Sequence, residues 1–192
     1  MIKAIVFDCF GVLTSDGWLP FAEKHFGHNK DLKQQSHDLN KQVDSGLLGY
    51  DDFVTQVAQL AKVSAAEAYR DIENNVANKD LFDYTAGLKK SYKIGMLSNA
   101  GANWLSELFD ADQVKLFDAV ALSYEIGITK PYPQAYHIIC DRLGVQPSEA
   151  VFIDDIERYV TGAKDIGMQG IWYKNNQQLQ ADLQTLLANP NS

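Results

Sequence analysis

Five short apolar runs constrain the fold of this chain more than any other feature of its sequence. They span residues 2–7, 93–97, 118–123, 150–153 and 170–173. Most are apolar at nearly every position, a pattern typical of parallel strands that helices cover on both faces. With 192 residues, of which 46% are apolar, the chain has enough material for one packed domain, or for one domain with a smaller insert.

Helical patterns separate the later runs. Apolar side chains share one helical face in residues 132–143, before Gly144, and again in residues 156–166, before Gly167. A glycine directly after the last periodic residue is a common helix stop. Strands that alternate with helices favour right-handed crossovers, so the sequence predicts a doubly wound α/β core with a parallel sheet.

Residues 16–84 interrupt this alternation. They contain no convincing strand, and Phe53, Val57 and Leu60 share one helical face. The stretch is far longer than a single crossover requires. We therefore predict a small all-helical cap domain over residues 16–84, inserted after the first strand into a core domain of residues 1–15 and 85–192.

Polar side chains lie at or soon after the carboxyl ends of the predicted strands. The carboxyl ends of parallel strands lie along one edge of a sheet, where ligands bind, so these side chains are expected to converge. Taken singly, each has a more ordinary explanation, since acidic residues often cap helices and lysines are commonly solvated. The residues are Asp8, Ser98, Asn99, Lys130, Asp154 and Asp155.

The chemistry of this set suits the transfer of a phosphoryl group. Asp8 and the pair at residues 154–155 offer the hard oxygen ligands that Mg²⁺ prefers. The hydroxyl of Ser98 and the N–H groups that follow it can hold anionic oxygens, and Lys130 adds a positive charge. A cation and a lysine together would let an aspartate nucleophile approach a phosphate anion.

Charge and cysteine content narrow the range of partners. The net charge is −8 at pH 7 and no stretch is rich in Lys or Arg, which argues against a nucleic-acid partner. No apolar run approaches the ~20 residues that span a bilayer. Cys9 and Cys140 do not make a disulfide framework, and we expect Cys9 to be packed in the interior. We expect a cytoplasmic monomer or homodimer that binds no membrane.

Four segments, in order, resemble the motifs of the haloacid dehalogenase-like (HAD) hydrolase superfamily. They are VFDCFGVL at 6–13, GMLSN at 95–99, GITKPYP at 127–133 and VFIDD at 151–155. The resemblance implies a Rossmann-like core, and it identifies the helical insert with the superfamily's first-type cap. It also implies that Asp8 attacks the substrate to form an aspartyl intermediate. Ser98 and the N–H of Asn99 would then bind phosphate oxygens, and Lys130 would stabilise the transferring group.

The resemblance further implies a Mg²⁺ site made by Asp8, the backbone carbonyl of Phe10, Asp155, and Asp154 directly or through water. Phe10 is the departure from the pattern, because most phosphatases of the superfamily have an Asp there that protonates the leaving oxygen and later activates water. An aromatic residue at this place resembles the 2-haloacid dehalogenases, which use no metal. Asp16 offers a substitute proton donor.

The acidic pair at residues 154–155 carries more weight than Phe10, because a metal-free displacement at carbon gives no reason to gather three carboxylates. In keeping this pair without an Asp at position 10, the chain resembles members of the subgroup of sugar-phosphate phosphatases and amino-terminal domains of epoxide hydrolases. The sequence therefore predicts a Mg²⁺-dependent phosphatase of a small phosphorylated metabolite. A 2-haloacid dehalogenase and a non-catalytic metal-binding protein of the same fold remain alternatives, and the substrate stays open.

Overall fold

The computed structural model describes residues 1–188 and contains a parallel sheet of five strands. The strand order is β3-β2-β1-β4-β5, so the chain leaves the central strand first to one side and then to the other. This is the doubly wound core that the apolar runs predict. The strands are β1 (Ala4–Phe7), β2 (Lys93–Ser98), β3 (Ala119–Leu122), β4 (Ala150–Asp154) and β5 (Gln169–Trp172).

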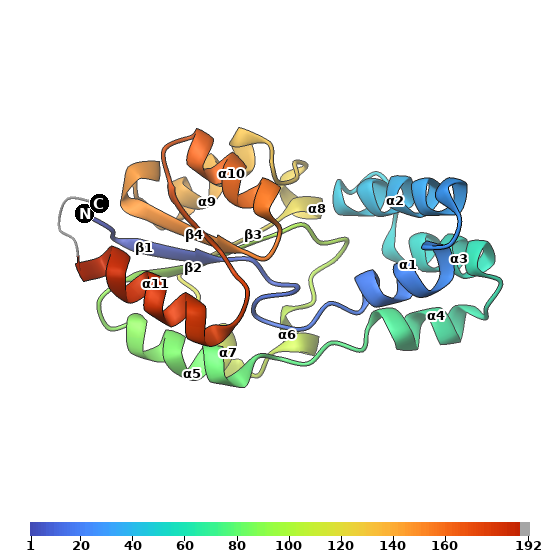
Figure 1. The fold of residues 1–192 in the computed structure, drawn as a ribbon, viewed down its shortest axis with the longest axis horizontal. Helices are drawn as coiled ribbons and strands as arrows, with labels where there is room; N and C mark the ends of the chain where they lie inside the picture. Colours follow the sequence, from blue (N-terminus) through green and yellow to red (C-terminus); the bar gives the residue numbers. More distant parts are fainter. Residues whose placement is uncertain (189–192) are drawn as a thin grey trace.

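Helices cover both faces of this sheet (Figure 1). One face packs against α9 (Pro133–Leu143) and α10 (Glu157–Asp165), the two helices that the sequence predicts in the crossovers. The other face packs against α5 (Lys79–Leu88) and α11 (Asn176–Ala188). In the part of the chain that the structure describes, no helix combines the length and apolar character needed to cross a membrane. The connections hold α6 (Leu105–Leu108), α7 (Ala111–Val114), α8 (Ser123–Ile126) and the 3₁₀ turn η1 (Pro147–Glu149).

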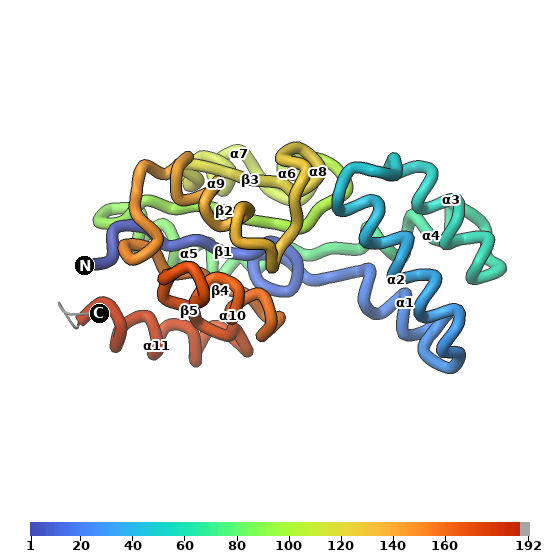
Figure 2. Tube along the Cα trace, turned by 90° about the horizontal axis from the view of Figure 1, so that it is seen from above, coloured from blue at the N-terminus to red at the C-terminus, as the bar shows by residue number. Residues whose placement is uncertain are grey.

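The insert forms a separate group of helices beyond the carboxyl ends of the strands (Figures 1 and 2). These helices bury their apolar faces against one another, in a hydrophobic cluster distinct from the two that flank the sheet. Amphipathic helices too short to be stable alone gain most of their stability from such packing. They are α1 (Trp18–Phe26), α2 (Lys30–Asp44), α3 (Tyr50–Ala61) and α4 (Ala65–Ile72).

Helix α5 belongs with the sheet by its packing. Its buried residues Leu81 and Phe82 lie in the same hydrophobic cluster as Phe7 of the central strand. The two connections to the cap run side by side, because the N–H of Ser15 donates to the carbonyl of Val76 at 3.0 Å. We therefore propose that the cap ends near residue 76, whereas the sequence predicts its end at residue 84. The domain division otherwise stays a prediction.

The cap rests on the core at the carboxyl end of α2. The hydroxyl of Ser123, which directly follows β3, donates to the carbonyl of Asp44 and accepts from the N–H of Ala100 at 2.9 Å. Tyr50 of α3 packs edge-on against Trp104 of the core, with 4.4 Å between ring centroids. These contacts place the cap over the loops that follow β2 and β3.

Candidate functional site

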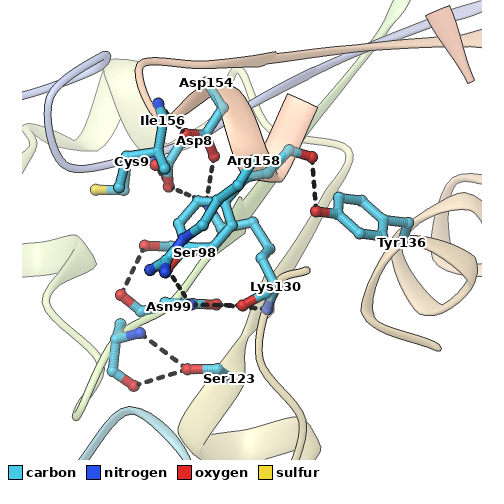
Figure 3. Close-up of polar contacts among 12 residues, drawn as sticks. Asp8, Cys9, Ser98, Asn99, Ser123, Lys130, Tyr136, Asp154, Ile156 and Arg158 are labelled. Carbon is cyan, nitrogen blue, oxygen red and sulfur yellow. Dashed lines mark hydrogen bonds and ion pairs between the residues drawn. The ribbon is translucent and has the colours of Figure 1, made fainter. Parts of the chain in front are cut away.

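The register of the strands brings the predicted polar side chains together. Phe7 of β1 pairs with Ile153 of β4, so the residues that follow, Asp8 and Asp154, leave neighbouring strands at the same level. Ser98 ends β2, the strand on the other side of β1. Figure 3 shows the resulting cluster of Asp8, Ser98, Asn99, Lys130 and Asp154.

Lys130 lies at the centre of this cluster. Its Nζ is 2.7 Å from Asp8 Oδ1 and 2.7 Å from Asp154 Oδ2, and all three side chains are buried. Burial disfavours the ammonium, but the carboxylates of Asp154 and Asp8 outweigh this cost and raise the pKa of Lys130 above its ordinary value. The rings of Phe152 and Tyr159 flank the charge, with centroids 5.3 and 4.9 Å from Nζ. Lys130 is therefore a fixed positive charge.

Asn99 positions Lys130 through the lysine backbone. Its Oδ1 accepts from the N–H of Lys130 at 2.8 Å, and its Nδ2 donates to the Lys130 carbonyl at 3.2 Å. Nδ2 also lies 3.3 Å from the hydroxyl of Tyr159. Tyr159 is held in turn by Tyr136, whose hydroxyl donates to the backbone carbonyl of Tyr159 at 2.7 Å. This clamp could not be predicted from sequence patterns, because its two partners are 31 residues apart.

Asp8, Asp154 and Asp155 form a compact acidic cluster, with ligand oxygens that all lie within 4.8 Å of one another. Burial, with a smaller contribution from Asp154, raises the pKa of Asp8 and raises that of Asp155 to about 6. Asp155 Oδ1 is buried and has no hydrogen-bond partner within residues 1–188. One ammonium thus balances three clustered carboxylates, and the unpartnered oxygen of Asp155 is available to bind a cation. This donor set fits a hard divalent cation such as Mg²⁺.

Gly11 allows Asp155 to approach the loop after β1. Its φ of +83° lies in the region that favours glycine, and a Cβ at this position would lie 2.3 Å from Asp155 Oδ2. The neighbouring side chain of Phe10 is half-buried and packs against the hydrophobic core. Phe10 therefore brings no proton donor to the site.

Substitution of this glycine is expected to weaken the metal site. Gly11→Ala should lower the affinity for Mg²⁺ by about 10- to 100-fold, because the new methyl group displaces Asp155. Isothermal titration with Mg²⁺ measures the loss. Gly167→Ala is the matched control, since its φ is also positive, at +91°, and a Cβ there meets nothing within 4 Å. Equal affinities in the two variants would show that the close approach has no bearing on metal binding.

Two further carboxylates lie near the cluster. Asp16, the substitute donor considered from sequence, accepts hydrogen bonds from the N–H groups of Trp18 at 2.8 Å and Leu19 at 3.1 Å, at the start of α1. Asp44 is the last residue of α2. It carries no sequence signal of its own, because only the docking of the cap on the core brings it to this edge.

A family of known proteins matches most of this chain. The haloacid dehalogenase-like hydrolase family matches residues 2–167. The chain is 27% identical over 206 residues to a D-ribitol-5-phosphate phosphatase of Bacteroides thetaiotaomicron, across 97% of this chain and 99% of that protein.

Two solved structures have the same fold at low sequence identity. One is a HAD family enzyme from Bacteroides thetaiotaomicron in complex with magnesium and inorganic phosphate (TM-score 0.71, 23% identity, covering 91% of this chain and 95% of that one). The other is the L-2-haloacid dehalogenase from Xanthobacter autotrophicus (TM-score 0.65, 23% identity, 99% and 85%). The match of the family to nearly all of the core shows that the chain belongs to the haloacid dehalogenase-like hydrolases.

Proposed function

We propose that this protein is a Mg²⁺-dependent phosphatase that hydrolyses a small phosphomonoester through a covalent intermediate on Asp8. The observation that carries the proposal is the cluster of Asp8, Asp154 and Asp155, in which the first two are buried and paired with the ammonium of Lys130. A relative named for ribitol 5-phosphate, and a similar enzyme solved with magnesium and phosphate, favour a phosphorylated sugar or polyol as substrate.

Asp8 is oriented for attack by two donors on one of its oxygens. The N–H of Cys9 and the Nζ of Lys130 each lie 2.7 Å from Asp8 Oδ1. Attack requires the ionised carboxylate. Burial and the charge of Asp154 raise the pKa of Asp8, whereas Lys130 lowers it and so favours the ionised form. Ser98 and the N–H of Asn99 bind phosphate oxygens in this proposal, and Lys130 stabilises the charge of the transferring group.

The cation would be held by Asp8, Asp155 and the backbone carbonyl of Phe10, with Asp154 directly or through water. Bound there, Mg²⁺ supplies charge neutralisation between two anions, the nucleophile and the phosphate. Asp154 is held by the N–H of Ile156 at 2.8 Å and by Lys130, so its oxygens are fixed before any ligand binds. The carbonyl of Phe10 serves as a ligand whatever its side chain.

A 2-haloacid dehalogenase is the second candidate, because Phe10 is aromatic and the fold is shared with such an enzyme. Displacement of halide from carbon needs a nucleophile and a lysine, but it gains nothing from Asp155, whose buried oxygen lacks a partner among the described residues. The dehalogenase would release halide from 2-chloropropionate in the presence of EDTA. The phosphatase would not.

Removal of Mg²⁺ is expected to abolish phosphate release. EDTA should stop turnover of ribitol 5-phosphate and p-nitrophenyl phosphate, and added Mg²⁺ should restore it. Asp155→Asn should raise the Mg²⁺ concentration for half-maximal activity by about 10- to 100-fold. Asp165→Asn, an exposed change on α10, is the control and should leave that concentration unchanged. Calorimetric Mg²⁺ binding without turnover of any substrate would instead identify a non-catalytic protein.

We also propose a cytoplasmic location. Cys9 and Cys140 are free and buried, and reducing compartments keep such thiols unpaired. Cell fractionation tests the location.

The oligomeric state, monomer or homodimer, remains a prediction that analytical ultracentrifugation would decide.

A further inference from the structure

Phe10 leaves the proposed reaction without a proton donor in the loop that carries the nucleophile. An alkyl leaving oxygen departs as an unstable alkoxide unless an acid protonates it, and such an acid typically contributes about 10²- to 10⁴-fold in rate. A donor must therefore come from another element that reaches the carboxyl edge of the sheet.

Asp16 is poorly suited to this task. Its Oδ1 accepts two backbone hydrogen bonds from the first turn of α1, from Trp18 and Leu19. Burial raises the pKa of Asp16 against these two bonds, but they commit Oδ1 as the cap of α1 and hold the carboxyl group at the start of that helix. His25 is also unsuitable, because its ring packs in the cap against Phe21, with 4.5 Å between centroids.

Asp44 lies at the one end of α2 that touches the core. Its carbonyl accepts from Ser123, whose hydroxyl also accepts from the N–H of Ala100, the residue after Asn99. The preceding residue, Val43, packs so closely on Gly101 that a Cβ there would lie 2.4 Å from Val43 Cγ2. Both views of the fold show this end of α2 beside α8 and the core (Figures 1 and 2). Core contacts therefore fix the backbone of Asp44 beside the loop that follows β2, which carries Asn99 and the proposed phosphate site.

The carboxyl group of Asp44 has the electrostatic setting of an acid that works near neutral pH. The Nδ2 of Asn40 donates to its Oδ2 at 2.9 Å. Burial raises the pKa of Asp44 to about 7, with Lys130 acting to lower it and Asp16 to raise it. Lys130 thus acts electrostatically on both Asp44 and the nucleophile. An acid with a pKa near the working pH can donate a proton and then take one back.

We propose that Asp44 is the general acid and base of the phosphatase reaction, acting from the cap in place of the carboxylic acid that is absent at Phe10. The inference rests on the proposed function. An oxygen of Asp8 attacks phosphorus, the bond from phosphorus to the leaving oxygen breaks, and that oxygen takes the proton of Asp44 and departs as an alcohol. Asp44 then accepts a proton from water as the water oxygen attacks the aspartyl phosphate. The Asp8–phosphorus bond breaks, inorganic phosphate leaves and Asp44 is protonated again.

The test compares a poor and a good leaving group. Asp44→Asn should lower kcat/KM for ribitol 5-phosphate by about 10²- to 10⁴-fold, and leave kcat/KM for 2,4-dinitrophenyl phosphate nearly unchanged, since dinitrophenolate departs without a proton. The same variant should release a burst of dinitrophenolate, because loss of the base slows hydrolysis of the aspartyl phosphate. Asp38→Asn is the matched control: Asp38 is exposed on the same helix and accepts from Gln34 at 2.9 Å, as Asp44 does from Asn40.

A double variant separates proton transfer from substrate binding. Phe10→Asp should recover much of the lost ribitol 5-phosphate activity in the Asp44→Asn background, because it returns a carboxylic acid to the loop that carries Asp8. Equal losses on both substrates, or no loss on either, would overturn the role of Asp44 while the phosphatase assignment stands. Absence of turnover by the wild-type protein on both phosphates would overturn the two proposals together.

Discussion

Asp8→Asn is expected to lower kcat for every phosphate ester by at least about 10⁴-fold, because the amide cannot attack phosphorus. The substitution keeps the size of the side chain and its acceptor for the N–H of Cys9. It also removes one of three clustered negative charges, while Lys130 keeps its contact with Asp154. The free energy of unfolding at neutral pH should therefore be unchanged or higher. Phosphate release and urea denaturation, measured on the same sample, check the two halves of this expectation.

The control for this variant is Asp83→Asn, an exposed change on α5 that should retain full activity. Rapid acid quench of the wild-type protein should trap phosphate on the chain, and peptide mapping should place it on Asp8. Full activity of Asp8→Asn with any phosphate ester would exclude Asp8 as the nucleophile.

Lys130→Met is expected to cost about 3–5 kcal/mol of unfolding free energy in the absence of Mg²⁺. The variant leaves the carboxylates of Asp8 and Asp154 buried without the ammonium that lies 2.7 Å from each. Activity should be lost as well, since the same ammonium stabilises the transferring group in the proposed reaction. Urea denaturation with EDTA present measures the change in stability.

Lys174→Met is the matched control for this second prediction. Lys174 also lies over an aromatic ring, that of Trp172 at 4.6 Å, but it is exposed. Loss of an exposed cation–π contact should cost no more than about 1 kcal/mol. Mg²⁺ should restore part of the stability of Lys130→Met, because a cation bound to the native state alone stabilises it. Equal losses of unfolding free energy in the two lysine variants would mean that the ion pairs of Lys130 do not offset the repulsion among the clustered carboxylates.

The sheet and its crossover helices were predictable because each follows from local physics. A strand covered on both faces must be apolar at nearly every position, and β1 and β4 are buried throughout. A helix on such a face shows a stripe of apolar residues, as α9 and α10 do. The cap boundary was harder to place, since the pattern of α5 predicts a helix without saying whether its partner is the sheet or the cap.

The edge of the sheet at which the acidic cluster and Lys130 meet was predictable before the fold was known. Residues at the carboxyl ends of neighbouring parallel strands converge whatever the detail of their side chains, because the sheet aligns those ends along one edge. Asp8, Lys130 and Asp154 could be placed together for this reason. Their aromatic flank and the clamp by Asn99 could not, because packing alone selects those partners.

Which side chain the cap brings to this edge depends on how the folded cap docks on the core. Asp44 reaches it through a contact with Ser123, a residue 79 positions away in the chain. Helical periodicity describes how α2 packs within the cap, but it carries no information on how the cap sits on the core. That placement depends on the shape of two surfaces that form only after each part has folded, and so the candidate proton donor could be found only in the folded structure.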